Sequence, residues 1–315
     1  MSEMSNKPNR RQFLSTAGLV GVGAVLASCA PAIATPGKAN LDIAILNFAL
    51  NLEYLEAAFY LAAVGRIAEL KAIGGSAEIR LPGNFNGMSR VNFGSDVLGM
   101  ATSSYADEIA NDELAHVKAL RATIIALGSA PVDRPVLDIG PAFAAAANAA
   151  AANAGLPTPL NPDFNPYTNA LYFLHGAFIF EDVGVTAYHG AARLITDDSA
   201  GGVLDAAAGI LAVEAYHAGE IRTLLYSQRD QQTGYGVNVA QLVGAISALR
   251  AKVGGGKDQG ITSDNTATGA ANIVPADANA IAYGRTTDEV LNIVYLGSKS
   301  TPGGFFPNGL NGTIR

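Results

Sequence analysis

Apolar and polar positions alternate with helical period along four long stretches of the chain, and these stretches predict four helices. The first covers residues 41–70 and stops at a Gly-Gly pair, and the second covers residues 95–127 and stops before a glycine. The third and fourth cover residues 166–194 and 202–226 and are joined by a short polar turn. Strand patterns are sparse, tryptophan is absent and alanine is abundant. We therefore predict an all-α four-helix bundle at residues 41–228.

The connections inside this bundle differ greatly in length. Residues 74–94 carry turn-forming residues and are predicted to be an inserted loop between the first two helices. Residues 129–166 contain seven prolines and form a long connection between the second and third helices. An alanine-rich stretch at residues 142–154 can form a short helix of its own. A long crossover of this kind is one way to connect a four-helix bundle.

The chain continues beyond the bundle with a segment rich in Gly, Asn, Thr and Ser. A fifth helix is predicted at residues 239–253, stopped by three glycines, and a last short helix at residues 287–295, capped by Thr287. Apolar residues recur through the rest of this segment. We expect residues 229–315 to be a loop-rich extension packed on the bundle.

The first 28 residues have the features of an export signal. An Asn-Arg-Arg-Gln-Phe-Leu motif at residues 9–14 is typical of twin-arginine signals, and a short apolar stretch follows it. The run Leu-Ala-Ser-Cys that ends at Cys29 resembles a bacterial lipobox, and Cys29 is the only cysteine. We predict twin-arginine export, a lipid on Cys29 and a linker at residues 29–40; an ordinary cleavage site at residues 32–34 is the alternative. The mature protein is then expected in the periplasm or cell envelope, anchored to a membrane.

The charge of the mature chain argues against nucleic acid as a partner. The whole chain has a net charge of −7, and removal of the signal takes away three cations and one anion, leaving about −9. No later segment is long and apolar enough to cross a membrane. The sequence leaves open whether the protein forms a homo-oligomer.

Two copies of a Glu-x-x-His motif give the bundle a candidate metal centre. Residues three apart share one face of a helix, so each Glu/His pair can point at a common centre. Each copy follows a helix that carries a further glutamate among apolar residues. A glutamate from each of two helices and Glu-x-x-His from two others form the ligand set of two-metal carboxylate bundles. The predicted ligands are Glu53, Glu113, His116, Glu181, Glu214 and His217.

A tyrosine follows each upstream glutamate after seven residues, which is two helical turns. Tyr60 follows Glu53 at this distance, and Tyr188 follows Glu181. The order Glu…Tyr, Glu-x-x-His thus occurs twice, which indicates an internal duplication of a helix pair. Both tyrosines are candidates to line the site and bond to its ligands, with ordinary core tyrosines as the alternative.

The donor set favours iron or manganese over zinc or copper, because it is rich in oxygen and holds only two imidazoles. Four carboxylates neutralise two divalent cations, and burying them without cations is costly. Glu113 and Glu214 lie in mid-helix and are predicted to bridge the two ions. The alternatives are helix-surface charges or a polar pocket without metal.

Three further acidic residues lie close to these motifs in the sequence. Glu56 stands one turn after Glu53, and Glu220 one turn after His217. Each is an extra ligand, a shuttle for metal ions or a surface charge. Asp112 is predicted to accept a hydrogen bond from the far ring nitrogen of a ligand histidine, as carboxylates commonly do around metals.

Three other polar residues of the third helix receive no role in the site. Asp182, next to a predicted ligand, is expected to be a charge on the helix surface. His175 and His189 lie off the ligand spacing and are interpreted as ordinary helix histidines.

These residues resemble the ferritin-like superfamily, and more closely the family of exported ferritin-like and plant desiccation-related proteins. The segments at residues 46–56, 285–295 and 303–312 carry the closer resemblance, so it extends over nearly the whole mature chain. The resemblance implies a ferritin-like four-helix bundle. Classical ferritins also form cages, but the long loops and the extension argue against a 24-subunit shell here.

Three functions fit the sequence. An exported two-metal oxidoreductase would act on oxygen or peroxide in stress protection, as a ferroxidase or a manganese-catalase-like enzyme. A structural or desiccation-protection protein of the envelope would use the metal only to hold the bundle together. A metal-storage protein would exchange its ions. The motifs do not assign a catalytic residue, so enzyme activity stays open.

Overall fold

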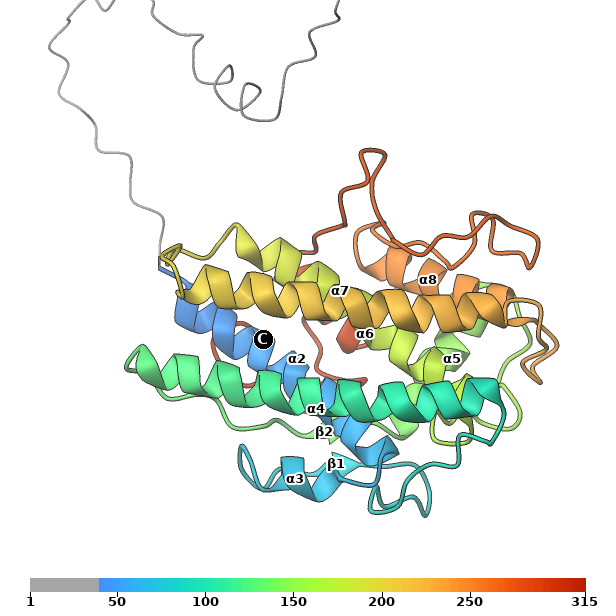
Figure 1. Ribbon diagram of the computed structural model, residues 1–315, viewed down its shortest axis with the longest axis horizontal. Coiled ribbons are helices and arrows are strands. Elements are labelled where there is room, and N and C mark those ends of the chain that lie inside the picture. Colours follow the sequence, from blue (N-terminus) through green and yellow to red (C-terminus); the bar gives the residue numbers. More distant parts are fainter. Residues whose placement is uncertain (1–39) are drawn as a thin grey trace, which may run out of the picture. The chain divides into compact units, whose positions relative to one another are not determined.

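The computed structural model describes residues 40–315, and the export motif, the lipobox and Cys29 lie outside the described residues. No helix within this range is long and apolar enough to cross a bilayer. Helices and two short strands follow one another along the chain (Figure 1). Their order is α2 (Asp42–Ala63), α3 (Ile67–Lys71), β1 (Ile79–Arg80), α4 (Val97–Ala126), β2 (Leu137–Asp138), α5 (Pro141–Asn153), α6 (Ala170–Ala192), α7 (Val203–Ser227), α8 (Val239–Val253) and α9 (Thr287–Val294).

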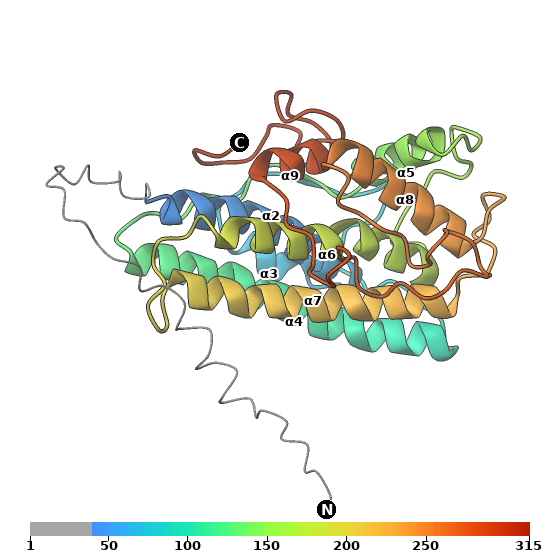
Figure 2. The same ribbon diagram turned by 90° about the horizontal axis from the view of Figure 1, so that it is seen from above.

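Four long helices form the predicted bundle, and they are covered on one side by the crossover and the extension. Helices α2 and α4 pack as one pair, and α6 and α7 as the other. Figure 2 shows α4 and α7 on one side, α2 and α6 in the middle, and α5, α8 and α9 on the other side. This order explains why residues 50–63 of α2 and 173–188 of α6 are buried all round. Helices α4 and α7 bury one face only.

The first helix is shorter than its hydrophobic pattern predicts. It ends at Ala63, because Gly65 adopts a left-handed φ of 81° and its Cα lies against the backbone of Ser89 and Arg90. The separate helix α3 follows. The inserted loop also contains β1, which pairs in parallel with β2 of the crossover, a contact that the sequence did not predict.

Side-chain caps fix where several helices begin. Asp96 accepts a hydrogen bond from the Gly99 amide at the start of α4. At α9 the cap is Thr286 in a capping box with Glu289, so the prediction of Thr287 as the cap was wrong by one residue.

The extension is held to the bundle by buried charges. Asp182 is buried, and the prediction that it is a surface charge was wrong. Its Oδ2 accepts hydrogen bonds from Arg222 at 2.9 Å and from Arg250 at 2.6 Å. Asp258 binds Arg250 at 2.9 Å and Arg285 at 2.7 Å. Residues of α6, α7, α8 and the tail therefore share one network of ion pairs.

Candidate metal centre

The bundle brings all six predicted ligands together between the α2–α6 and α4–α7 layers. Their donor atoms form two overlapping groups, and within each group the atoms lie within 4.8 Å of one another. The carboxylates of Glu113 and Glu214 belong to both groups. The first group adds Glu53 and His116, and the second adds Glu181 and His217. Two ions that share two carboxylates would require this arrangement.

The facing atoms of these side chains are buried without hydrogen-bond partners. Both oxygens of Glu113 and Glu214, and Nδ1 of each histidine, have none. Nδ1 of His116 lies 3.2 Å from Oε2 of Glu53, and Nδ1 of His217 lies 3.2 Å from Oε1 of Glu113. Donors held about 2.1 Å from one octahedral ion stand about 3 Å apart. The unpaired donors are therefore spaced as ligands that converge on cations, and the residues fit a pair of metal ions.

The two tyrosines connect the two halves of the centre. The hydroxyl of Tyr60, on α2, donates a hydrogen bond to Oε1 of Glu181 on α6. The hydroxyl of Tyr188, on α6, donates to Oε1 of Glu53 on α2. Each tyrosine thus bonds to the glutamate of the other repeat, and both are buried. Each bond occupies one carboxylate oxygen and leaves Oε2 facing the centre.

One histidine is oriented by a carboxylate from the opposite helix pair. Nε2 of His217 lies 3.1 Å from Oδ2 of Asp112, so the ring donates its N–H there and turns the lone pair of Nδ1 to the centre. The sequence predicted such a contact for Asp112. The residue at the same place in the second repeat is Val213, which has no acceptor to offer His116.

A cleft of about 410 Å³ between α4 and α7 reaches His217. Its walls include Glu108 and Asp112 of α4, and Tyr216 and Glu220 of α7. Glu220 is half-buried in this cleft and belongs to neither ligand group. Glu108 was missed from the sequence, although it stands one helical turn before Asp112. The cleft gives polar molecules and cations an acidic approach to the centre.

Glu56 is a buried carboxyl at the inner end of the centre. Its equivalent in the second repeat is Gly184, since each follows an upstream glutamate by three residues. A Cβ on Gly184 would lie 2.3 Å from Oε2 of Glu214 and 3.3 Å from Oε1 of Glu56. The glycine therefore leaves room for both carboxyls. Burial and the charge of Glu113 hold the pKa of Glu56 well above its ordinary value, so this carboxyl keeps a proton.

Protons bind at the centre when no cation neutralises it. Burial opposes a charged imidazole, yet contacts with Glu113 and Glu53 raise the pKa of His116 to about 10. Burial likewise opposes charge on His217, but Glu181 and Glu113 raise its pKa to about 12. Burial and the charge of Glu113 raise the pKa of Glu53 to about 7. Metal binding must therefore release protons.

The shared carboxylates differ in protonation. Burial alone would raise the pKa of Glu113, but its contacts with the imidazoles of His116 and His217 lower it to about 2. Burial and the charge of Glu113 hold the pKa of Glu214 well above its ordinary value. Glu113 is therefore the anion that organises the cation-free centre, and Glu214 carries a proton there.

The other two histidines lie outside both ligand groups. His175 is buried, and its Nδ1 lies 2.7 Å from the carbonyl oxygen of Leu171. Burial lowers its pKa to about 4, so it is neutral. His189 is half-buried near the end of α6. Neither adds a donor to the centre.

Fold and site together define an all-α bundle of the ferritin type with a buried carboxylate–imidazole cluster compatible with metal binding. The model of the family described as "Ferritin-like domain" matches residues 41–227. The chain belongs to this family.

Two relatives match over most of the chain. One is the ferritin-like catalase Nec2 of Nesocodon mauritianus, 32% identical over 91% of this chain and 89% of that protein. Another is the desiccation-related protein PCC13-62 of Craterostigma plantagineum, 31% identical over 86% of this chain and 83% of that protein. The resemblance inferred from the sequence segments is thereby confirmed.

Proposed function

We propose that this protein is a two-metal oxidoreductase that disproportionates hydrogen peroxide, with iron or manganese held by the six predicted ligands. The observation that carries the proposal is the pair of buried ligand groups that share Glu113 and Glu214. The relative named as a ferritin-like catalase supports peroxide as the substrate. Two redox-active ions supply the electron transfers of this reaction. One peroxide is oxidised to dioxygen and a second is reduced to two waters, and two protons pass from the first to the second.

The surrounding residues orient the ligands and handle the protons. The tyrosine hydroxyls fix the orientation of Glu53 and Glu181, and Asp112 fixes the ring of His217. In the cation-free centre Glu56 carries a proton, and it is the group placed to exchange a proton with peroxide. Peroxide reaches the centre by the cleft between α4 and α7.

The first test is metal content and peroxide turnover of the mature protein, expressed in medium that contains both iron and manganese. We expect about two Fe or Mn per chain, the number that this ligand set holds, and release of dioxygen from peroxide. The double variant Glu113→Ala/His116→Ala should lose both. Glu78→Gln, an exposed carboxylate on the surface, is the matched control and should keep both. Full metal occupancy in the double variant would refute the proposal.

A non-enzymatic role in envelope protection is the second candidate, and the relative named as a desiccation-related protein favours it. In that case metal removal should destabilise the protein, but the loaded protein should turn over peroxide no faster than the double variant. Oxidation of Fe(II) by dioxygen without peroxide turnover would instead identify a ferroxidase. Loosely bound iron well above the two-ion complement would identify storage.

We also propose that the chain is exported by the twin-arginine route and lipidated at Cys29, because the motifs at residues 9–29 have this order. Replacing both Arg10 and Arg11 by Lys should leave the protein in the cytoplasm. Cys29→Ala should move it from the membrane fraction to the soluble envelope fraction. Mass spectrometry of the mature N-terminal peptide gives the decisive measurement, and an unmodified Cys29 would exclude the lipid.

A further inference from the structure

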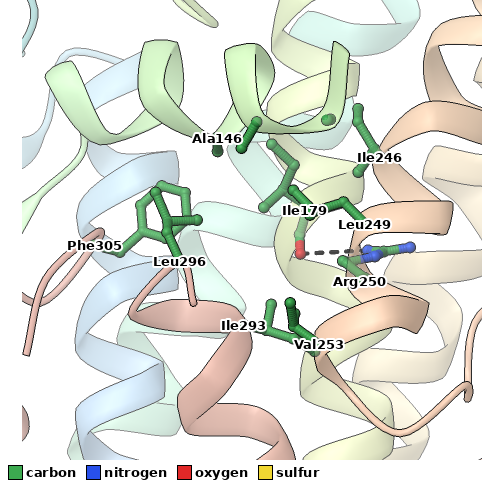
Figure 3. Close-up of a pocket in the computed structure, with 11 residues that line it drawn as sticks. Ala146, Ile179, Ile246, Leu249, Arg250, Val253, Ile293, Leu296 and Phe305 are labelled. Carbon is green, nitrogen blue, oxygen red and sulfur yellow. Dashed lines mark hydrogen bonds between the residues drawn. The ribbon is translucent and has the colours of Figure 1, made fainter. Parts of the chain in front are cut away.

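An apolar cavity of about 50 Å³ lies where the crossover and the extension close over α6. Figure 3 shows its walls, with Ala146 of α5, Ile179 of α6, Ile246 of α8 and Ile293 of α9 around one space. The cavity is therefore built by α5, α8 and α9 against the bundle. These helices lie on the opposite side of the bundle from α4 and α7, which wall the acidic cleft (Figure 2).

The lining of this cavity offers water few partners. Arg250 is its only polar side chain, and the terminal nitrogens of that guanidinium bind Asp182, Asp258 and the carbonyl oxygen of Ile179. Only Nε of Arg250 is without an acceptor. An ordered water typically needs two to four polar partners, and apolar cavities of sufficient size stay dry and take up small apolar ligands.

A second, smaller void lies between this cavity and the candidate metal centre. It measures about 10 Å³ and shares Ile179, Ile293 and Phe305 with the first cavity. Its other end is lined by Glu56 and Gly184. Because Gly184 has no side chain, its Cα lies directly against the carboxyls of the centre. The two voids therefore lie in line between helices α5, α8 and α9 and the candidate ligands, with the side chains of Ile179, Ile293 and Phe305 at their junction.

We propose that this cavity binds dioxygen and that, with the smaller void, it forms the passage of dioxygen between the metal centre and the surface. This inference rests on the proposed function, in which dioxygen is a product. Peroxide loses its hydrogen bonds in an apolar passage, whereas dioxygen has none to lose. The acidic cleft and the apolar passage thus separate the polar substrate from the apolar product. Rotamer changes of Ile179 and Ile293 open the narrow section.

Xenon is a suitable probe, because it binds dry apolar cavities without any chemistry. Crystals of the mature protein under xenon pressure should show xenon between Ile179 and Ile293. Ala150→Phe, which fills the cavity, should abolish this peak. Ala145→Phe is the matched control, since Ala145 is exposed on the same helix and does not line the cavity. Ile293→Val enlarges both voids and should increase xenon occupancy, which keeps the test valid if Ala150→Phe does not fold.

Turnover provides a second readout that separates the two proposals. Ala150→Phe should lower kcat for peroxide several-fold and leave kcat/KM close to that of Ala145→Phe, because peroxide enters by the other route. A cavity that holds ordered water and no xenon overturns the inference, whatever the activity. Loss of xenon with an unchanged kcat overturns the passage. A wild-type protein without peroxide turnover refutes the proposed function, and the xenon result still decides the ligand of the cavity.

Discussion

The helix pairs α2–α4 and α6–α7 present matching ligands to the centre through a duplicated pattern. The duplication extends beyond the ligands. In each helix pair, the residue that directly follows the upstream glutamate bonds to an arginine on the partner helix. That arginine stands eight residues after the glutamate of the Glu-x-x-His motif. These pairs are Tyr54 with Arg121, at 2.6 Å, and Asp182 with Arg222, at 2.9 Å. Each helix pair is therefore fastened internally at the same place, by a neutral hydroxyl in one and by a carboxylate in the other.

The two pairs differ in what surrounds the ligands. Glu56 of α2 faces Gly184 of α6, so one repeat adds a carboxyl where the other leaves space. Asp112 accepts a hydrogen bond from His217 and so orients its ring, whereas the equivalent Val213 has no acceptor for His116. The ligand set alone is nearly symmetric, and the asymmetry lies in these neighbours. We infer that the two ion positions are inequivalent, with the His217 position more firmly oriented and open to the cleft.

The largest expected effect comes from removing a ligand that both halves share. Glu214→Gln should abolish binding of both ions and reduce turnover to background, because this carboxylate belongs to both groups. His116→Ala should remove one ion first, since its imidazole belongs to one group only. Elemental analysis gives the number of metal ions per chain in each variant, and these two numbers are compared. Equal metal loss in both variants would mean that the two positions are not independent.

Asp182→Ala should cost about 3–5 kcal/mol of unfolding free energy, since it leaves two buried arginines without their shared carboxylate. The equivalent change in the other repeat, Tyr54→Phe, removes the two hydrogen bonds of one neutral hydroxyl, with Arg121 and with the carbonyl oxygen of Val132, and should cost about 1–2 kcal/mol. Urea denaturation of the metal-loaded variants measures both. A loss of about 1 kcal/mol or less in Asp182→Ala would show that this carboxylate contributes no more to stability than the Tyr54 hydroxyl does.

Glu56→Gln tests the carboxyl that has no equivalent in the second repeat, where Gly184 stands at the same place. The variant should keep both ions but lose about 100-fold in peroxide turnover, because an amide cannot lend and recover a proton. Metal content and kcat measured on the same preparation separate the two effects. If the variant loses metal instead, Glu56 is a ligand and the proton role is wrong.

Asp112→Ala should lower the affinity for one ion by about 10–100-fold, the usual effect of losing a carboxylate that orients a ligand histidine. Val213→Ala, the matched change in the other repeat, should leave the affinity unchanged. Competition with a chelator measures both. An equal response of the two variants would remove the asymmetry between His217 and His116.

The duplicated motif made the bundle and its inward-facing ligands predictable, because helical spacing alone places Glu and His on one face. Asp182 shows what spacing leaves out. Its partners Arg250 and Asp258 come from the extension, so nothing within α6 indicates that this carboxylate is buried. Glu56 was left open for the same reason, since Gly184, which makes room for it, lies on another helix. The burial of Asp182 and of Glu56 therefore depends on partners far away in the sequence, which the local pattern does not reveal.

The smallest effect concerns pH and the metal-free protein. Burial and the charge of Glu113 raise the pKa of Glu53 from 4.5 to about 7 on folding, and the pKa of Glu56 rises as well. Both contributions to stability are complete below pH 4.5; that of Glu53 is lost as the pH rises through about 7, and that of Glu56 is lost as the pH rises through its own raised pKa.

The melting temperature of the metal-free protein should therefore fall between pH 5 and pH 8, by about 2–4 °C for each kcal/mol lost. The imidazoles add to this fall above about pH 6.5, because they stay protonated in the folded protein, with pKa values of about 10 and 12, but lose their protons in the unfolded chain. Glu56→Gln should reduce the fall, since it removes one of the carboxyls that must ionise. The melting temperature of the metal-loaded protein should instead be higher at pH 8 than at pH 5, because cations bind the ionised carboxylates. A metal-free protein more stable at pH 8 would mean that the buried carboxyls are already ionised at pH 5.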